Sequence, residues 1–250
     1  MDYSVNTTIK NSILEIEFYN RRANSLNSDM LKQLTEIFDD AGKNDEILAI
    51  IFRSKGEKVF SAGASFDEMM AIEDFQIAKQ FFLGFAKLIW SMVNCPKFVI
   101  TLIQGKAIGG SVGLTAASDY VIATENAEFR LSEYSVGIGP FVIAPAIEKK
   151  IGLSPLMEMT IDTEYRSVEW ALRKGLVYKV FPDIEQVNEF TYKLAADIAK
   201  HNPKAVEELK TIFWEKERTD FSHYEERAEK SARLLLTDFT KAFLRDFKGG

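Results

Sequence analysis

The sequence predicts an α/β fold in which strand–turn–helix units repeat and an all-helical segment follows them. Short apolar runs rich in β-branched residues recur as far as Phe181, each followed by a turn and then a helical pattern. Beyond about residue 184 the strand pattern stops. The chain is 46% hydrophobic, which is enough to build a sizeable core.

Strands are expected where apolar residues cluster or alternate with acidic ones, at residues 13–18, 47–52, 98–103, 119–124, 128–131 and 177–181. Helices are expected where apolar residues recur at helical spacing, at residues 28–38, 74–94, 141–151, 185–200, 203–218 and 221–246. Asn202 before Pro203 is typical of a helix start, and Ser222 with Glu225 has the spacing of a capping box. We therefore divide the chain into a core, residues 1–184, and a helical region, residues 185–250, whose apolar sides need a partner to cover them.

Composition and charge argue against several classes of function. The net charge of −6 and the pI near 5.2 argue against a nucleic-acid partner. No apolar run approaches the ~18 residues of a membrane span, and the first residues carry no signal-peptide pattern. The single cysteine, Cys95, excludes an internal disulfide framework. We expect a cytoplasmic protein that binds neither nucleic acid nor membrane.

The segment 97–114 has the pattern of a buried strand, a turn and the start of a helix. Gly109 and Gly110 open the helix, and two adjacent glycines let a ligand approach the backbone because no Cβ stands in the way. The first N–H groups of a helix have no partner within it and carry the positive end of its dipole. Small residues at 61–65 precede a second short helix in the same way, and Glu133 follows a later strand. These parts could stabilise an oxyanion and move a proton, although a packing glycine pair, a tight turn and a surface glutamate are the alternatives.

Residues 109–113 also match G-x-S-x-G, the nucleophile elbow of serine hydrolases. Ser111 would be the nucleophile, and it would need a later histidine. Only His201 and His223 are available, and both fall in the helical region rather than on a loop after a strand. The hydrolase is therefore the weaker alternative, which full turnover by Ser111→Ala would eliminate. With one cysteine and no HxxxH or HExxH pattern, the sequence also predicts no metal site.

Three segments resemble the crotonase (enoyl-CoA hydratase/isomerase) superfamily, in order and at its usual separations. Residues 59–69, VFSAGASFDEM, look like the family's F-x-A-G-A-D-[IL]-x-E-[ML]. Residues 96–124 are similar to its P-K-P-[VT]-I-A-A-[IV]-x-G-x-A-x-G-G-G-x-E-L-x-x-x-C-D-x-x-[IV]-A, and residues 127–140 follow its A-x-F-x-x-P-E-x-x-[LI]-G-[IL]-x-P in spacing. The resemblance covers nearly the whole chain.

This resemblance implies a crotonase-like (ClpP/crotonase) spiral core of repeated ββα units, with C-terminal helices that form a homotrimer or a dimer of trimers. It implies an acyl-CoA thioester substrate and no separate cofactor, because the substrate carries the coenzyme A. On matched positions, the backbone N–H groups of Ala64 and Gly110 would form an oxyanion hole for a thioester enolate, and Glu133 would move the proton. The implied substrate contacts are Ala62, Ala64, Ser65, Phe66, Gly110, Gly113 and Phe141. Arg22 and Ala23 would contact the coenzyme A moiety, with Arg21, Arg22 or lysines of the helical region near its phosphates.

Departures from the family pattern favour chemistry with one base. Family hydratases use two glutamates: Glu133 matches the second, but the first falls on Gly113. Hydration is usually served by two carboxylates, whereas a double-bond shift can use one base that takes and returns a proton. We therefore expect isomerase-type or other one-base enolate chemistry. A classical enoyl-CoA hydratase of fatty-acid or branched-chain acyl-CoA metabolism and a non-catalytic acyl-CoA binder are the alternatives.

Three further departures lie near the expected site. Ser65 replaces the family's usual aspartate, and Ser132 replaces the proline before the glutamate. Phe141 stands where a glycine is common. A phenyl group there would reshape the acyl pocket and favour a compact or flat acyl group.

Overall fold

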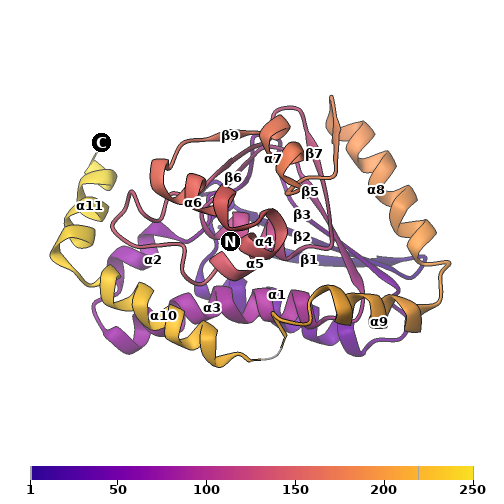
Figure 1. Cartoon of the computed structure of the whole chain (residues 1–250), viewed down its shortest axis with the longest axis horizontal. Helices are drawn as coiled ribbons and strands as arrows, with labels where there is room; N and C mark the ends of the chain where they lie inside the picture. The colour runs from indigo at the N-terminus through magenta and orange to yellow at the C-terminus, as the bar shows by residue number, and fades with distance from the viewer. Residues whose placement is uncertain (1, 219, 250) are drawn as a thin grey trace.

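The computed structural model of the chain describes residues 2–218 and 220–249 (Figure 1). The described strands are β1 (Tyr3–Lys10), β2 (Ile13–Asn20), β3 (Ala49–Ser54), β4 (Val59–Ser61), β5 (Phe98–Ile103), β6 (Lys106–Ile108), β7 (Tyr120–Thr124), β8 (Glu128–Arg130), β9 (Arg166–Ser167) and β10 (Lys179–Phe181). The described helices are α1 (Ser28–Lys43), α2 (Phe66–Ala71), α3 (Phe75–Asn94), α4 (Gly110–Ala117), α5 (Ala144–Ile151), α6 (Leu153–Asp162), α7 (Val168–Lys174), α8 (Ile184–Ile198), α9 (Pro203–Phe213), α10 (Ser222–Leu235) and α11 (Asp238–Gly249). Within the described ranges, no helix combines the length and the apolar character that a membrane span requires.

The strands alternate between two sheets. The larger sheet has the order β1-β2-β3-β5-β7-β10, and the smaller has the order β4-β6-β8-β9. β3 in the larger sheet leads to β4 in the smaller one and then to α2, and the paths β5–β6–α4 and β7–β8–α5 repeat this arrangement. The pairs β3/β5, β5/β7, β4/β6 and β6/β8 are all parallel. The expected spiral of repeated ββα units is therefore confirmed.

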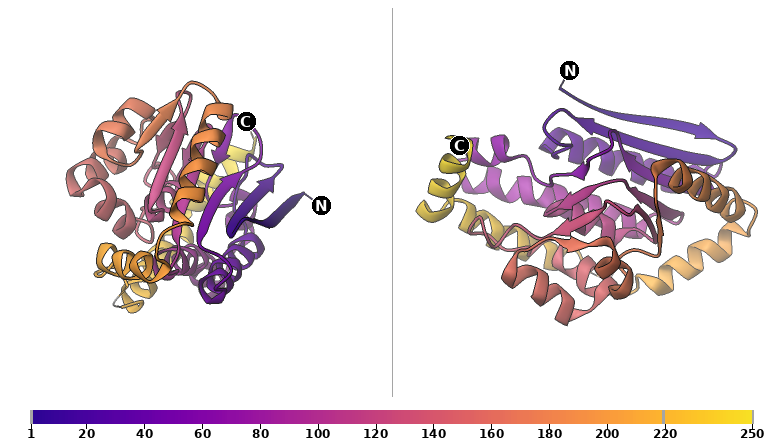
Figure 2. Two further views of the ribbon diagram at one scale, coloured as in Figure 1. Left: turned by 90° about the vertical axis from the view of Figure 1, so that its right-hand side faces the viewer. Right: turned by 90° about the horizontal axis from the view of Figure 1, so that it is seen from above.

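The central strands of the larger sheet, β3, β5 and β7, are buried on both faces. Ile50 and Phe52 of β3 belong to the main core, which includes residues of α1 and α3. Ala49 and Ile51, which alternate with these residues along the strand, point to the other face. Val187 and its neighbours on α8 cover them there. Figure 2 shows α8 along this outer face of the sheet. Burial on both faces explains why the parallel strands are continuous apolar runs.

The C-terminal helices fold back onto the core. Lys210 of α9 is fully buried: its Nζ lies 2.8 Å from Asp119 Oδ2 and donates to the carbonyl oxygen of Lys97 at 2.8 Å. α10 lies along α3 (Figure 1), and Lys79 of α3 pairs with Glu229 of α10 at 2.9 Å. α11 packs against α2. The C-terminal helices therefore reach the helix that follows the β4–α2 loop.

Two expectations about helices were wrong. The single helix expected at 221–246 is divided into α10 and α11, with Leu236 and Thr237 between them. The expected capping box at Ser222 and Glu225 does not form, because Ser222 is already helical and its N–H donates to Asp220 Oδ1 at 2.8 Å.

Candidate active site

A cavity of about 60 Å³ lies where three segments meet: the β4–α2 loop, the β6–α4 loop and the segment after β8. Ala64, Gly110 and Glu133 all line it, and α3 closes one side with Phe82 and Phe85. About 10–15 Å³ of such volume holds one water molecule, so the cavity has room for about four to six water-sized groups. The residues predicted from three separate sequence segments therefore line one cavity.

Gly63 brings the first two loops together. Its φ of +80° is unfavourable for other residues, and a Cβ there would lie 2.5 Å from the carbonyl oxygen of Ile108 and 3.0 Å from the nitrogen of Gly110. The next residue, Ala64, is held because Leu26 N–H donates to the Gly63 carbonyl and Ser65 N–H donates to the Leu26 carbonyl. Neither hydrogen bond uses the N–H of Ala64. Among the described residues, no backbone acceptor for the Ala64 N–H is seen.

Gly109 and Gly110 make room for neighbouring side chains. A Cβ on Gly109 would lie 3.1 Å from Glu133 Oε1, and a Cβ on Gly110 would lie 2.4 Å from the ring of Phe85. Gly110 is the first residue of α4, so its N–H has no partner within the helix. Gly109 N–H donates to the Arg130 carbonyl at 2.8 Å, which holds this loop against the end of β8. Because Gly109 and Gly110 have no side chains, Phe85 and Glu133 can pack closely against this loop.

Ser111 does not have the environment of a nucleophile. It is fully buried, and its Oγ accepts the N–H of Ile108 at 2.8 Å and lies 2.9 Å from the carbonyl oxygens of Ser61 and Ile108. It does not line the cavity, and His201 and His223 are both exposed. Ser111 instead ties the β4–α2 loop to the β6–α4 loop. This geometry argues against the serine hydrolase.

Glu133 has an unusual carboxyl group. Its Oε2 atom is buried and has no hydrogen-bond partner among the described residues, although the residue as a whole is half-buried. Burial raises the pKa of Glu133 to about 7, and hydrogen bonds from the backbone N–H groups of Glu133 and Ser132 only partly offset this rise. Val136 and Ile138 donate their N–H groups to the Glu133 carbonyl and fix the turn. A carboxyl group with a pKa near 7 can both accept and return a proton at neutral pH.

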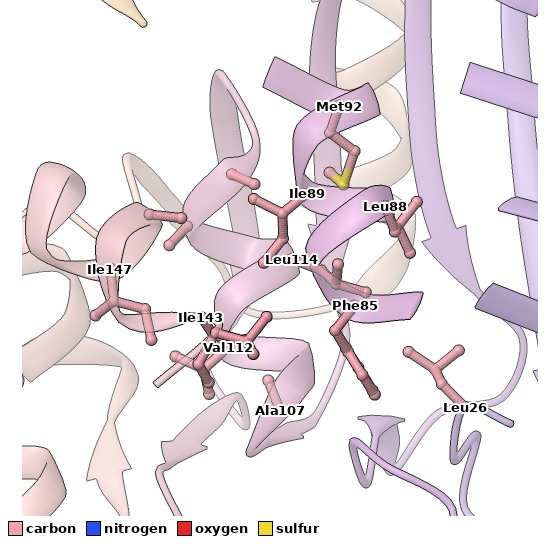
Figure 3. Close-up of a cluster of buried hydrophobic side chains, with 14 of the residues drawn as sticks. Leu26, Phe85, Leu88, Ile89, Met92, Ala107, Val112, Leu114, Ile143 and Ile147 are labelled. Carbon is pink, nitrogen blue, oxygen red and sulfur yellow. The ribbon is translucent and has the colours of Figure 1, made fainter. Parts of the chain in front are cut away.

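Gly113 lies outside the lining of the cavity. It is buried in α4, and a Cβ there would lie 2.5 Å from both Cβ and Cγ2 of Ile143 and 3.4 Å from Cδ1 of Ile89. Figure 3 shows Ile89, Leu114 and Ile143 together in this cluster of buried side chains. Ile143 lines the cavity in front of Gly113. The space that a side chain at position 113 would need is already filled.

The other expected substrate contacts divide into two groups. Ala62 and Phe66 line the cavity. Phe141 does not: its ring packs over Gly139, where a Cβ would lie 2.6 Å from Cζ of Phe141. Ser65 also lies outside the cavity, and its hydroxyl caps α2 by accepting the N–H of Glu68.

Arg22 and Ala23 lie at a neighbouring surface turn. Ala23 accepts the N–H of Ala62 at 2.9 Å, which fixes this turn beside the cavity. Arg22 is exposed and pairs with Asp67. The charged residues lining the adjacent groove are Asp2, Arg21, Arg22, Asp29, Asp67 and Glu68. Because carboxylates outnumber guanidinium groups there, the groove itself is not a cationic phosphate site.

Several lining residues had no sequence signal as site residues. Phe82 and Phe85 fall within the helix expected at residues 74–94, and periodicity does not distinguish a core position from a cavity wall. Ser231 belongs to no motif, is 1% exposed, and reaches the cavity only through the packing of α10 along α3. A residue brought to a site in this way cannot be found from spacing or periodicity. The structure therefore adds a polar group to the cavity that the sequence did not predict.

Comparison with known proteins identifies relatives over most of the chain. A family model described as enoyl-CoA hydratase/isomerase matches residues 8–242. The short-chain-enoyl-CoA hydratase of Clostridium acetobutylicum is 32% identical over 184 residues, covering 73% of this chain and 70% of that protein. The mitochondrial Delta(3,5)-Delta(2,4)-dienoyl-CoA isomerase of Rattus norvegicus is 29% identical over 215 residues, which cover 80% of this chain and 65% of that protein. The carnitinyl-CoA dehydratase of Escherichia coli K12 is 29% identical over 222 residues, or 85% and 81% of the two chains.

Solved structures show the same fold. The chain matches an enoyl-CoA hydratase from Bacillus halodurans with a TM-score of 0.90 at 21% identity, covering 97% of this chain and 99% of the other. It matches an enoyl-CoA hydratase/isomerase from Pseudoalteromonas atlantica T6c with a TM-score of 0.87 at 20% identity, covering 98% and 97%. At this level of identity the comparison establishes the architecture.

Proposed function

The chain belongs to the enoyl-CoA hydratase/isomerase family of enzymes, and we propose that it acts on an acyl-CoA thioester through an enolate, with Glu133 as the single acid–base group. The observation that carries this proposal is the shared cavity of Ala64, Gly110 and Glu133, in which Glu133 Oε2 has no partner among the described residues. The amides of Ala64 and Gly110 would hold the thioester oxygen as negative charge develops on it. One such donor commonly contributes about 3–4 kcal/mol to catalysis.

The carboxyl group of Glu133, which lines the same cavity as the two amides, supports a proton transfer at the carbon next to the thioester carbonyl. Glu133 in its ionised form would remove a proton from that carbon, and the resulting enolate oxygen would be held by the two amides. The protonated Glu133 would then return the proton to a different carbon and leave a shifted double bond. A pKa of about 7 keeps both forms of the carboxyl group accessible near neutral pH.

One-base chemistry is favoured over two-carboxylate hydration by the surroundings of Gly113. Ile143 fills the space in front of it. Glu133 is the only carboxylate among the described residues that line the cavity. Hydration is the second candidate, and the name of the Clostridium relative, a short-chain-enoyl-CoA hydratase, favours it.

The first test is Glu133→Gln. Glutamine keeps the size and shape of the side chain but cannot take up the proton, so we expect turnover to fall about a hundredfold or more while thioester binding persists. Turnover should be followed with both a 2-enoyl-CoA and a 3-enoyl-CoA, and binding by calorimetry. Unchanged turnover would remove Glu133 from the mechanism.

The same assays separate the candidate reactions. Incorporation of solvent oxygen into the product indicates hydration, and a double-bond shift without solvent oxygen indicates isomerisation. A non-catalytic acyl-CoA binder would bind the thioester but exchange no α-proton with deuterated water. Exchange across a short panel of acyl-CoA thioesters therefore tests the enolate directly.

The substrate would carry the coenzyme A moiety, which would extend out of the cavity beside Ala23. The contact of Ala23 with Ala62 supports this position. Arg22 would have to exchange its partner Asp67 for a phosphate. Residues 1–184 would then form the catalytic core, and residues 185–250 would add helices that complete it and take part in assembly.

We also propose that the chain assembles as a homotrimer, alone or as a dimer of trimers. Exposed apolar residues support an interface. Leu153, Met157 and Ile161 lie one turn apart on α6 and are 56%, 51% and 66% exposed, and Ile212 and Phe213 of α9 are 65% and 51% exposed. A subunit that exposed these side chains to water permanently would be prone to association.

A further inference from the structure

Ser231 is a polar residue in the wall of the cavity. The residue is 1% exposed and lines the cavity, and its hydroxyl makes no hydrogen bond with another described residue. Some helical hydroxyl groups bond back to their own helix, as Thr35 does to the Leu31 carbonyl at 2.7 Å and Thr160 to the Leu156 carbonyl at 2.7 Å, whereas Thr191 Oγ1 in α8 is buried without a partner among the described residues. A buried hydroxyl without a hydrogen bond is destabilising. Because Ser231 also lines the cavity, its hydroxyl can form a hydrogen bond with a group bound there.

The contacts of α10 place Ser231 away from the oxyanion loops. Glu229 of α10 pairs with Lys79 of α3, and Arg233 lies over the ring of Phe75. Ser231 lies between these two contacts and therefore beside the first turns of α3. Phe85, which packs against Gly110, comes at least one turn later in α3.

Arg227 fixes the orientation of α10. Its Nη1 donates to the Phe141 carbonyl at 3.1 Å. Ser231 follows four residues later and lies on the same face of the helix. That face is turned towards the segment that supplies Ile138 and Val142 to the cavity wall. Ser231 thus lies on the wall of the cavity that α10 forms with this segment, and in the proposed function this wall would face the acyl chain rather than the thioester.

The charge of the cavity limits what Ser231 can bind. Glu133 is the only charged side chain among the described residues lining the cavity, and no cation accompanies it there. A second carboxylate would lose its hydration without gaining a partner. A hydroxyl or keto oxygen needs one hydrogen bond, which Ser231 can donate or accept.

We propose that Ser231 binds a neutral oxygen on the acyl chain of the substrate, beyond the carbons that take part in proton transfer. The substrate class is then a short acyl-CoA with a distal hydroxyl or keto group. This inference rests on the proposed function and assigns Ser231 as a residue that determines specificity.

The test compares 4-hydroxybutyryl-CoA with butyryl-CoA, which lacks the oxygen but is otherwise the same. Binding of both thioesters to the full-length protein is measured by calorimetry for the unchanged chain, Ser231→Ala, Ser231→Thr and the control Ser222→Ala, an exposed serine of the same helix. We expect the unchanged chain to prefer 4-hydroxybutyryl-CoA. Ser231→Ala should weaken binding of that thioester by about three- to tenfold and leave butyryl-CoA unaffected. Ser231→Thr, which keeps the hydroxyl, and Ser222→Ala should retain the preference.

The outcomes separate this inference from the proposed function. Equal affinity for the two thioesters, or an equal effect of Ser231→Ala on both, overturns the role of Ser231 while leaving enolate chemistry intact. Tighter binding of succinyl-CoA than of 4-hydroxybutyryl-CoA overturns the requirement for a neutral oxygen. Exchange of the α-proton of butyryl-CoA in deuterated water reports on Glu133 and the two amides independently of Ser231.

Discussion

Burial raises the pKa of Glu133 to about 7, well above that of an ordinary glutamate, and this rise has opposite effects on activity and stability. The carboxyl group must be ionised in the free enzyme to accept a proton, so kcat/KM should rise with pH and level off above a pKa of about 7. The raised pKa also means that the folded state binds this proton more tightly than the unfolded state. Its contribution to stability is therefore present below the unfolded pKa and is lost as pH rises through about 7.

Both effects can be measured on one pair of proteins. The pH profile of kcat/KM should show an acid limb with a midpoint near 7. Glu133→Gln, which cannot ionise, should be more stable than the unchanged chain above that pH by about 1–3 kcal/mol in urea unfolding, and the difference should shrink at lower pH. The carboxyl group would be well solvated if the acid limb had its midpoint near the pKa of an ordinary glutamate and the stability difference between the two proteins did not change with pH.

Gly113 shows why the missing glutamate of the family pattern cannot be restored by one substitution. A Cβ there would lie 2.5 Å from Ile143, so Gly113→Ala should destabilise the fold by about 1–3 kcal/mol through overpacking. The control is Gly84→Ala in α3, where the added Cβ would meet the flexible end of Leu31 at 3.0 Å. Urea unfolding measures both variants. Equal stability of Gly113→Ala and Gly84→Ala would contradict the argument, as would efficient hydration of a 2-enoyl-CoA by Gly113→Glu.

The site residues differ in how far the sequence could predict them. Ala64, Gly110 and Glu133 lie in segments whose spacing predicts a strand end, a turn and a helix start, and all three line the cavity. Gly113 and Phe141 lie in the same segments but outside the lining, because the side chain of Ile143 and the orientation of the Phe141 ring depend on tertiary packing. Their roles as substrate contacts stay predictions.

At the level of elements, α11 supports the helix that follows the Ala64 loop. Lys241 donates through Nζ to the carbonyls of Met69 at 3.1 Å and Met70 at 3.4 Å, and to that of Ile72. The last carbonyls of a helix have no partners within it, so Lys241 satisfies the C-terminal end of α2. Partial burial lowers the pKa of Lys241, although the charge of Glu73 opposes this shift.

Lys241→Met should therefore loosen α2. The variant keeps the length of the side chain but loses the charged donor, and we expect the free energy of unfolding to fall by about 1–3 kcal/mol. Amide exchange in α2 should accelerate more than exchange in α8, which Lys241 does not contact. Lys230→Met, at an exposed position of α10, is the matched control. If the two variants exchange and unfold alike, the contact with α2 is not a support for that helix.

The main strands were predictable because the central strands of the larger sheet are covered on both faces and are apolar runs. β4 and β6 of the smaller sheet were not expected, because neither three-residue strand lies in a longer apolar or alternating run, as the equally short β8 and β10 do. β1 was also missed: five of its eight residues are exposed, and its pairing with β2 defines it. The division between α10 and α11 lies within a continuous helical pattern, which gave no signal for a break.

At the level of the whole molecule, the C-terminal helices are fixed to the core by polar contacts rather than by apolar packing alone. Asp119 accepts hydrogen bonds from Trp214 Nε1 and from Val99 N–H, both at 2.8 Å, in addition to its ion pair with Lys210. A buried charge whose partner is removed costs about 3–5 kcal/mol, so these contacts hold α9 in one position. The exposed side of α9, with Ile212 and Phe213, is therefore presented as a rigid surface.

The proposed trimer can be tested on the apolar residues of α6. Met157 lies at the centre of the row formed with Leu153 and Ile161, so Met157→Lys would place a charge in the middle of an interface there. We expect the unchanged chain to sediment with three or six times the subunit mass of 28.4 kDa and Met157→Lys to shift towards the single subunit. The control is Lys174→Met, at an exposed position outside this row. A monomeric unchanged chain would contradict the proposed assembly, and an intact trimer of Met157→Lys would place the interface on another face.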